Sequence, residues 1–118
     1  GGDPSFGTAV VFNSSVTYSI GSVFDSNSNR VVVAYKNVGD AQKGYAVVGS
    51  VSGSSITFGT GVVFENGGEI RDDAISLAFD SNSNKVVIAY KDANYKGSAI
   101  VGTVLSRSER QSCFTTQP

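Results

Sequence analysis

The sequence predicts an all-β protein built from two tandem copies of one four-stranded antiparallel unit. Three blocks of sequence occur twice along the 118 residues, which indicates a duplicated unit. A composition with 14 glycines and only 2 prolines, rich in serine, asparagine and valine, is typical of short strands joined by tight turns. No segment repeats its apolar residues with a period of about 3.6, so the sequence predicts no helix.

The repeat sets the order of the strands. Its offset drifts along the chain, which places insertions and deletions between the matched blocks, where loops are expected. The offsets are 52, 55 and 53 residues, measured from Phe6 to Phe58, from Phe24 to Phe79 and from Gly44 to Gly97. The matched segments are residues 5–12 with 57–64, 24–36 with 79–91, and 44–51 with 97–104.

Each copy contains four strand candidates in the same order. The third is apolar on both alternating faces, so we expect it to be covered on both sides. The expected strands are residues 5–12, 20–24, 30–36 and 45–51 in the first copy and 56–65, 75–79, 85–91 and 98–104 in the second. The two repeats, about 5–55 and 56–105, form one unit over 1–105. The polar tail 106–118 has no counterpart in the repeat and is predicted to be disordered.

An Asp-Ser-Asn-Ser-Asn segment joins the second and third strands of each copy. Asp and Asn bond to their own backbone and tolerate positive φ, as tight turns require. The spacing also matches the start of a calcium loop, although lysine or arginine stands where such a loop needs Gly and Glu. We expect structural turns, and calcium is the alternative for Asp25, Asn27, Asn29, Asp80, Asn82 and Asn84.

Four antiparallel strands whose middle members are covered on both faces meet the requirement for one blade of a β-propeller. Two blades cannot close a ring, because propellers usually contain about four to eight. Two alone would also leave sheet faces and edges exposed. We therefore predict a homo-oligomer that completes a propeller, with a trimer favoured and a tetramer as the other option. The alternative is a monomeric β-sandwich or barrel.

The segment Phe-Asp-Ser-Asn-Ser-Asn, followed after one arginine by Val-Val-Val-Ala-Tyr, resembles short-repeat β-propellers. The chain is similar above all to lectins whose two-blade chains trimerise into six-bladed rings. It is also similar to propeller-like repeats of phage and environmental sequences, which imply no chemistry. The resemblance extends over about residues 5–105 and lies in the order and spacing of the expected strands. Resemblance to the lectins implies a non-catalytic, carbohydrate-binding module with repeated sites around a ring.

Composition and charge argue against several function classes. The chain has no histidine and one cysteine, which excludes Ser-His-Asp and Cys-His nucleophiles. Carboxylates at equivalent repeat positions are poor candidates for the unequal acid and base of a glycosidase, so we expect no enzyme and no cofactor. A net charge of −1 and the absence of a long apolar run argue against nucleic acid and membrane as partners.

The sharpest binding hypothesis concerns tyrosines at the end of the third strand. Each is followed by a lysine and then by an amide or a carboxylate, beside loops of variable length. An aromatic face with hydrogen-bonding groups beside it suits a sugar ring. The candidate ligand-binding residues are Tyr35, Lys36, Asn37, Tyr45, Tyr90, Lys91, Asp92 and Tyr95. Two alternatives stay open: the tyrosines pack between blades, and the chain is a structural or self-assembling module, such as a virion or surface component, without a small ligand.

Overall fold

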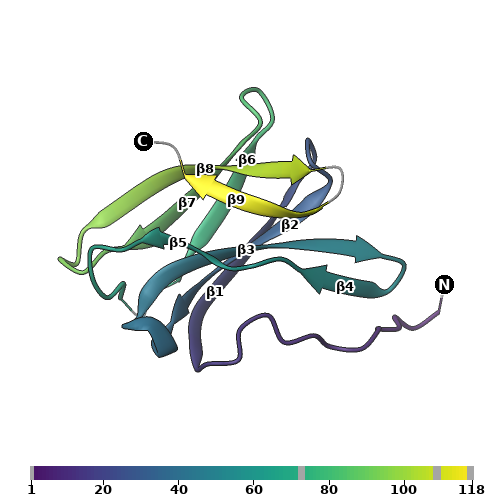
Figure 1. Cartoon of the computed structure of the whole chain (residues 1–118), viewed down its shortest axis with the longest axis horizontal. Coiled ribbons are helices and arrows are strands. Elements are labelled where there is room, and N and C mark those ends of the chain that lie inside the picture. Colours follow the sequence, from purple (N-terminus) through teal and green to yellow (C-terminus); the bar gives the residue numbers. More distant parts are fainter. Residues whose placement is uncertain (1, 72–73, 108–109, 117–118) are drawn as a thin grey trace.

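The computed structural model describes residues 2–71, 74–107 and 110–116, and it confirms the all-β fold class (Figure 1). Sheet 1 has the order β1 (Thr17–Asp25), β2 (Arg30–Asn37), β3 (Lys43–Ser52) and β4 (Ser55–Phe58), and β5 (Val62–Glu65) also pairs with β3. Sheet 2 has the order β6 (Ser76–Asp80), β7 (Lys85–Lys91), β8 (Gly97–Arg107) and β9 (Arg110–Thr116). A 3-10 turn, η1 (Val38–Asp40), is the one helical element in the described ranges.

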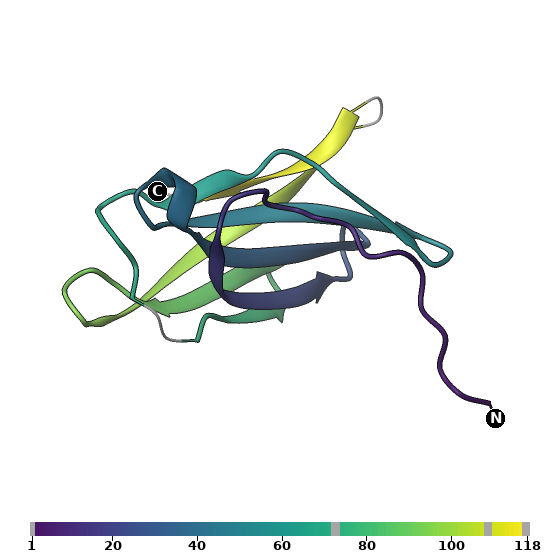
Figure 2. The same ribbon diagram turned by 90° about the horizontal axis from the view of Figure 1, so that it is seen from below.

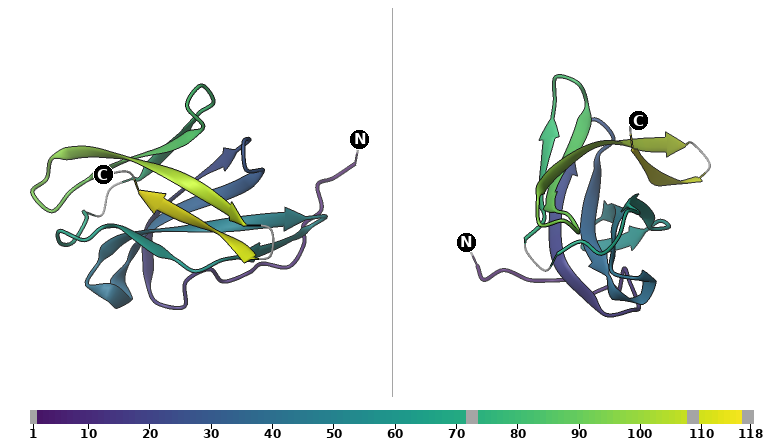
Figure 3. Two further views of the ribbon diagram at one scale, coloured as in Figure 1. Left: turned by 45° about the horizontal axis from the view of Figure 1, so that its top comes forward. Right: turned by 90° about the vertical axis from the view of Figure 1, so that its left-hand side faces the viewer.

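The two sheets reproduce the sequence repeat in strand order and register. All strand pairs are antiparallel, and both units are meanders of consecutive hairpins. Ala34 faces Ala46 across β2 and β3, and the equivalent Ala89 faces Ala99 across β7 and β8. The sheets lie face to face, as the end-on view of Figure 3 shows. Two open antiparallel sheets fit a blade-like arrangement and a sandwich equally well.

The first strand of the first copy is not formed, which corrects the prediction for residues 5–12. Residues 2–16 form no strand and extend along and beyond sheet 1 (Figures 1 and 2); we call them the N-terminal arm. The matched segment of the second copy forms two short strands, β4 and β5, on the same edge of β3. No strand equivalent to β3 precedes the arm among the described residues. Without a neighbouring strand, the backbone N–H and C=O groups of the arm cannot form the hydrogen bonds that would hold it in a sheet.

The C-terminal tail contains a strand, so the prediction of a disordered segment 106–118 is wrong for its described part. β8 runs to Arg107, and β9 pairs with it from Arg110 to Thr116. Phe114 is 3% exposed, and its ring occupies the space where a side chain on Gly102 would lie. β9 therefore pairs with β8 and adds Phe114 to the core between the sheets. Residues 108–109 and 117–118 lie outside the described residues.

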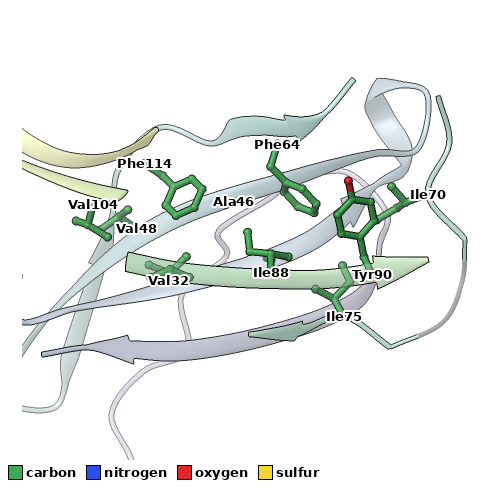
Figure 4. Close-up of a cluster of buried hydrophobic side chains, with 12 residues drawn as sticks. Val32, Ala46, Val48, Phe64, Ile70, Ile75, Ile88, Tyr90, Val104 and Phe114 are labelled. Atoms are coloured by element: carbon green, nitrogen blue, oxygen red, sulfur yellow. The ribbon is translucent and has the colours of Figure 1, made fainter. Parts of the chain in front are cut away.

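A continuous core fills the space between the sheets (Figure 4). Phe64 from β5 meets Tyr90 from β7 edge-on, with ring centroids 5.2 Å apart. The inner face of sheet 1 is made of small and β-branched side chains, all at most 3% exposed: Val32, Ala34, Ala46 and Val48. Sheet 2 contributes valine, isoleucine and aromatic side chains to the same core: Val86, Ile88, Tyr90, Val104 and Phe114.

The third strand of each copy was expected to be covered on both faces, and this holds for β2 only. The outer side of β2 carries Val33 and Tyr35, which are buried under Phe12 of the arm and Phe58 of β4. On β7, by contrast, the side that points away from the core has an exposed Ala89. Sheet 2 therefore has one covered and one uncovered face among the described residues.

Candidate functional site

The first Asp-Ser-Asn-Ser-Asn segment forms a structural turn. Asp25 is buried, and its Oδ1 accepts hydrogen bonds from the backbone N–H groups of Asn27 at 2.9 Å and Ser28 at 3.1 Å. Its backbone carbonyl accepts from the N–H of Asn29 at 2.8 Å. Asn29 has a φ of 63°, the left-handed region that asparagine tolerates. The carboxylate is thus engaged by its own turn.

The second turn has the same construction at Asp80. Its Oδ1 accepts from the N–H of Asn82 at 3.0 Å, its Oδ2 accepts from the Ser83 hydroxyl at 2.9 Å, and Asn84 has a φ of 60°. The Ser83 hydroxyl, followed by the backbone of Asn82, lowers the pKa of Asp80. No group of three or more His, Cys, Asp or Glu side chains suited to a metal occurs in the described part of the chain. The geometry matches the structural-turn interpretation.

The first-copy candidates for ligand binding lie mostly inside the protein. Tyr35 is 2% exposed, and burial raises its pKa. Lys36 is 0% exposed and points into the space between the sheets, where its Nζ lies 3.4 Å from Glu69 Oε2. Asn37 is 9% exposed, and its Oδ1 accepts from the N–H of Gly39 at 3.0 Å. Tyr35 packs under Phe12 and Phe58 on the outer side of sheet 1, whereas the alternative given for it was packing between blades.

Tyr45 is half-buried and stacks on Tyr35 with ring centroids 5.8 Å apart. Its hydroxyl donates a short hydrogen bond to the carboxylate of Asp40. That bond raises the pKa of Tyr45 to about 12 and lowers the pKa of Asp40. Lys43 lies 3.5 Å from the same carboxylate. Tyr45, Asp40 and Lys43 thus form a cluster at one end of sheet 1, in which the Tyr45 hydroxyl already donates its hydrogen bond to Asp40.

The second-copy candidates divide between the core and the surface. Tyr90 is 8% exposed and its hydroxyl donates a short hydrogen bond to Glu65; burial, followed by that bond, raises its pKa. Asp92 accepts from the Ser98 hydroxyl at 2.7 Å, and this bond lowers the pKa of Asp92. Tyr90 therefore does not share a surface with the remaining candidates.

Tyr95 is the candidate that reaches solvent most fully, at 63% exposure. The guanidinium carbon of Arg71 lies 4.1 Å from its ring centroid, and Lys91 Nζ lies 5.3 Å from it. Arg71 also donates to the carbonyl of Ala93 at 2.8 Å, which fixes it beside the ring. The structure thus brings Tyr95 and Lys91 together at the surface, whereas Lys36, the equivalent of Lys91 in the first copy, is buried.

A different surface emerges when the two copies are compared face by face. The inner face of sheet 1 (Val32, Ala34, Ala46 and Val48) is covered by sheet 2. The equivalent positions of sheet 2 carry the same four residue types in the same register, and they point away from the core. We call this set the outer face of sheet 2: Val87, Ala89, Ala99 and Val101. Val87 is half-buried, the two alanines are exposed, and Val101 is 38% exposed.

Sheet 1 shows the complementary difference on β1. Phe79 of β6 and Ile75, which directly precedes β6, belong to the core between the sheets, where Ile75 is 6% exposed. Their equivalents on β1, Ile20 and Phe24, are 58% and 52% exposed. We call these two residues the exposed rim of sheet 1. Inside the molecule, the equivalents of these two surfaces contact each other between the sheets. The outer face of sheet 2 and the exposed rim of sheet 1 are therefore the two sides of the same kind of contact, each without its partner.

The sequence interpretation missed both surfaces, although a signal was present. The third and fourth strands carry the same Val, Ala, Ala and Val in the two copies, while only one copy can be covered by the other. With two copies, the Val, Ala, Ala and Val of one copy are left without a covering sheet.

The chain matches no protein-family model, no curated protein and no solved structure. Within the described ranges, no helix has the length and apolarity needed to span a membrane.

Proposed function

We propose that this chain is a non-catalytic, self-assembling module whose copies join head to tail. The observation that supports the proposal is the repeated Val-Ala-Ala-Val face. It is buried in sheet 1, whereas in sheet 2 Val87 is half-buried and the other three residues are exposed. The covering surface would be sheet 1 of a second copy, whose exposed rim repeats the residues that cover the first face. Burial of apolar surface is the driving force.

The proposed junction joins unlike surfaces, as the junction inside the chain does. Such a heterologous contact generates a closed ring if the rotation closes and an open filament if it does not. We favour a ring of three chains, with four as the other option, because propellers contain about four to eight blades. The module would then act as a structural or surface component through its own assembly.

Light scattering on a size-exclusion column tests the proposal with three proteins. We expect the unaltered chain to elute with the mass of three or four copies. Val101→Glu places a charge in the centre of the proposed junction and should reduce the mass to one chain. Ser81→Glu, in the exposed β6–β7 turn, adds the same charge elsewhere and should leave the assembly intact. Circular dichroism would check that all three proteins keep their strands.

Two results would overturn the proposal. One is a single-chain mass for the unaltered protein. The other is a multimer that survives Val101→Glu as well as it survives Ser81→Glu, because the outer face of sheet 2 would then lie outside the contact.

A carbohydrate-binding function is a second proposal, supported by the exposed ring of Tyr95 next to Lys91 and Asp92. A sugar would stack on the aromatic ring and form hydrogen bonds with the neighbouring charged groups. A glycan array read with the unaltered chain and with Tyr95→Ala tests it. Binding that is lost in the variant supports a lectin-like site, and silence across the array from a correctly folded protein contradicts it.

A further inference from the structure

We infer that the N-terminal arm of one chain adds as a strand to the open edge of β8 in the next chain, with Phe12 seated over Gly97. The inference rests on the proposed head-to-tail assembly and identifies the segment that completes the junction.

The first copy contains the template for this contact. β5 adds to the edge of β3, where Ala46 faces Val62 and Tyr45 faces Val63. The ring of Phe64 then lies directly over Gly44, so close that a Cβ on this glycine would stand 2.6 Å from the tip of the ring. Glycine is required at position 44 because the aromatic ring occupies the place of its side chain.

The equivalent place on sheet 2 is vacant among the described residues. β9 pairs with β8 only from Gly102 onward, and no described strand pairs with that edge at residues 97–101. A Cβ built on Gly97, the equivalent of Gly44, would meet nothing within 4 Å. The chain thus keeps a glycine, and the room for an aromatic ring above it, where its own residues supply no ring.

The arm carries the segment that matches this vacancy. Residues 5–12 repeat residues 57–64, the part of the chain that forms β4 and most of β5. Their apolar side chains are exposed: Phe6 by 88%, Val10 by 44% and Val11 by 77%. An apolar segment that is exposed to solvent and belongs to no strand among the described residues is suited to addition onto a sheet edge.

Phe12 already has half of the contacts that Phe64 makes. Phe64 touches Gly44 in sheet 1 and meets Tyr90 in sheet 2 at 5.2 Å and 72°. Phe12 meets Tyr35, the equivalent of Tyr90, at 5.1 Å and 62°. The missing half is a glycine on the edge of a preceding sheet, and Gly97 of another copy is that residue.

The repeat also predicts the register and the extent of the added strand. β9 occupies on β8 the place that β4 occupies on β3, so the first part of the arm finds its position taken. The part equivalent to β5 is free to pair. Transfer of the β3–β5 register places Val10 opposite Ala99 and Val11 opposite Ser98 of the partner.

Gly97→Val tests the seat without disturbing the single chain, since no described residue would lie within 4 Å of a Cβ at that position. We expect the variant to keep its circular dichroism spectrum and thermal midpoint but to lose the multimer peak in light scattering. Gly2→Val is the matched control, because Gly2 also has nothing within 4 Å, and it should assemble like the unaltered chain.

Cross-linking tests the register directly. A chain with Val11→Cys and a chain with Ser98→Cys, each also carrying Cys113→Ser, are mixed and oxidised. We expect a disulfide-linked pair on a non-reducing gel. The mixture of Thr8→Cys with Ser98→Cys is out of register and should give much less product.

The outcomes separate this inference from the proposed function. If the chain assembles and Val101→Glu disrupts it, but Gly97→Val assembles normally and Val11→Cys does not cross-link, the arm lies elsewhere and the inference is overturned while the junction stands. If the unaltered chain is a single copy, the proposed function fails, and the inference fails with it.

Discussion

Gly44 and Gly97 occupy equivalent positions in the repeat but have opposite surroundings. The ring of Phe64 fills the side-chain position of Gly44, whereas the position above Gly97 is vacant. The same residue type is thus required by packing in one copy and by nothing within the described chain in the other. Two residues at equivalent positions of the repeat can be compared directly, because each one serves as the control for the other.

Gly44→Ala should destabilise the protein by about 1–3 kcal/mol, the usual cost of overpacking a core. Gly97→Ala should leave the free energy of unfolding of the single chain almost unchanged, because its methyl group points into open space. Urea denaturation of both variants, each combined with Val101→Glu so that assembly does not contribute, measures the difference. Equal losses for the two variants would contradict the described place of Phe64.

Tyr45 should ionise late in an alkaline titration. Its hydroxyl donates to Asp40, and this raises its pKa to about 12. Because the folded state raises the pKa, the stabilisation is complete below the ordinary tyrosine value near 10 and is lost as the pH rises through about 12. Tyrosinate absorbance, compared between the unaltered chain and Tyr45→Phe, isolates this group. A difference curve with its midpoint near pH 10 would contradict the hydrogen bond.

At the scale of elements, the sequence predicts most of the strands but not the ends of the sheets. β2, β3, β7 and β8 follow from runs of β-branched residues between Gly- and Asn-rich turns. The split of 56–65 into β4 and β5 could not be predicted, because it depends on both strands sharing one edge of β3. β9 was missed because its segment is polar apart from Cys113 and Phe114, and alternation gives no signal from so few residues.

Phe114→Ala should destabilise the chain by about 3–5 kcal/mol, as for other buried phenylalanines, because the side chain belongs to the core between the sheets. Phe6→Ala is the matched control. Its side chain is 88% exposed, and the change should stay within about 0.5 kcal/mol. Denaturant unfolding of the two variants in the Val101→Glu background provides the comparison. A neutral Phe114→Ala would mean that β9 does not contribute to the core.

The candidate ligand residues show why a site is harder to predict than a strand. Tyr35 and Lys36 are neighbours on a strand that is covered on both faces, so both became buried although they point in opposite directions. The sequence could not indicate this for Lys36, because its partner Glu69 comes from the connection between the two sheets. Tyr95 reaches the surface because it lies in a loop, at a φ of 66°.

At the scale of the whole molecule, the contact between the two sheets within a chain and the proposed junction between chains differ at one corner. Inside the chain, Gly21 of β1 lies so close to the start of β6 that a Cβ there would stand 2.4 Å from the carbonyl oxygen of Ile75, the residue before this strand. The repeat places Ser76 at the equivalent position of sheet 2. The proposed junction between chains would therefore be wider at this corner than the junction within a chain.

Ser76→Gly should let this corner close and should tighten the assembly. We expect a dissociation constant several times lower than that of the unaltered chain, measured by light scattering on serial dilution. Ser81→Gly, in an exposed turn, controls for the general effect of replacing a serine by glycine. An unchanged or weaker association of Ser76→Gly alone would show that β6 does not approach the β1 of a neighbour.

The proposed pairing of unlike sheet faces would give each chain a polarity, like the two ends of a filament subunit. Val101→Glu and Phe24→Glu would act as opposite chain terminators, one on the outer face of sheet 2 and the other on the exposed rim of sheet 1. Neither variant could associate with itself. A mixture of the two still contains one intact surface of each kind, so it should form a complex of two chains and stop there.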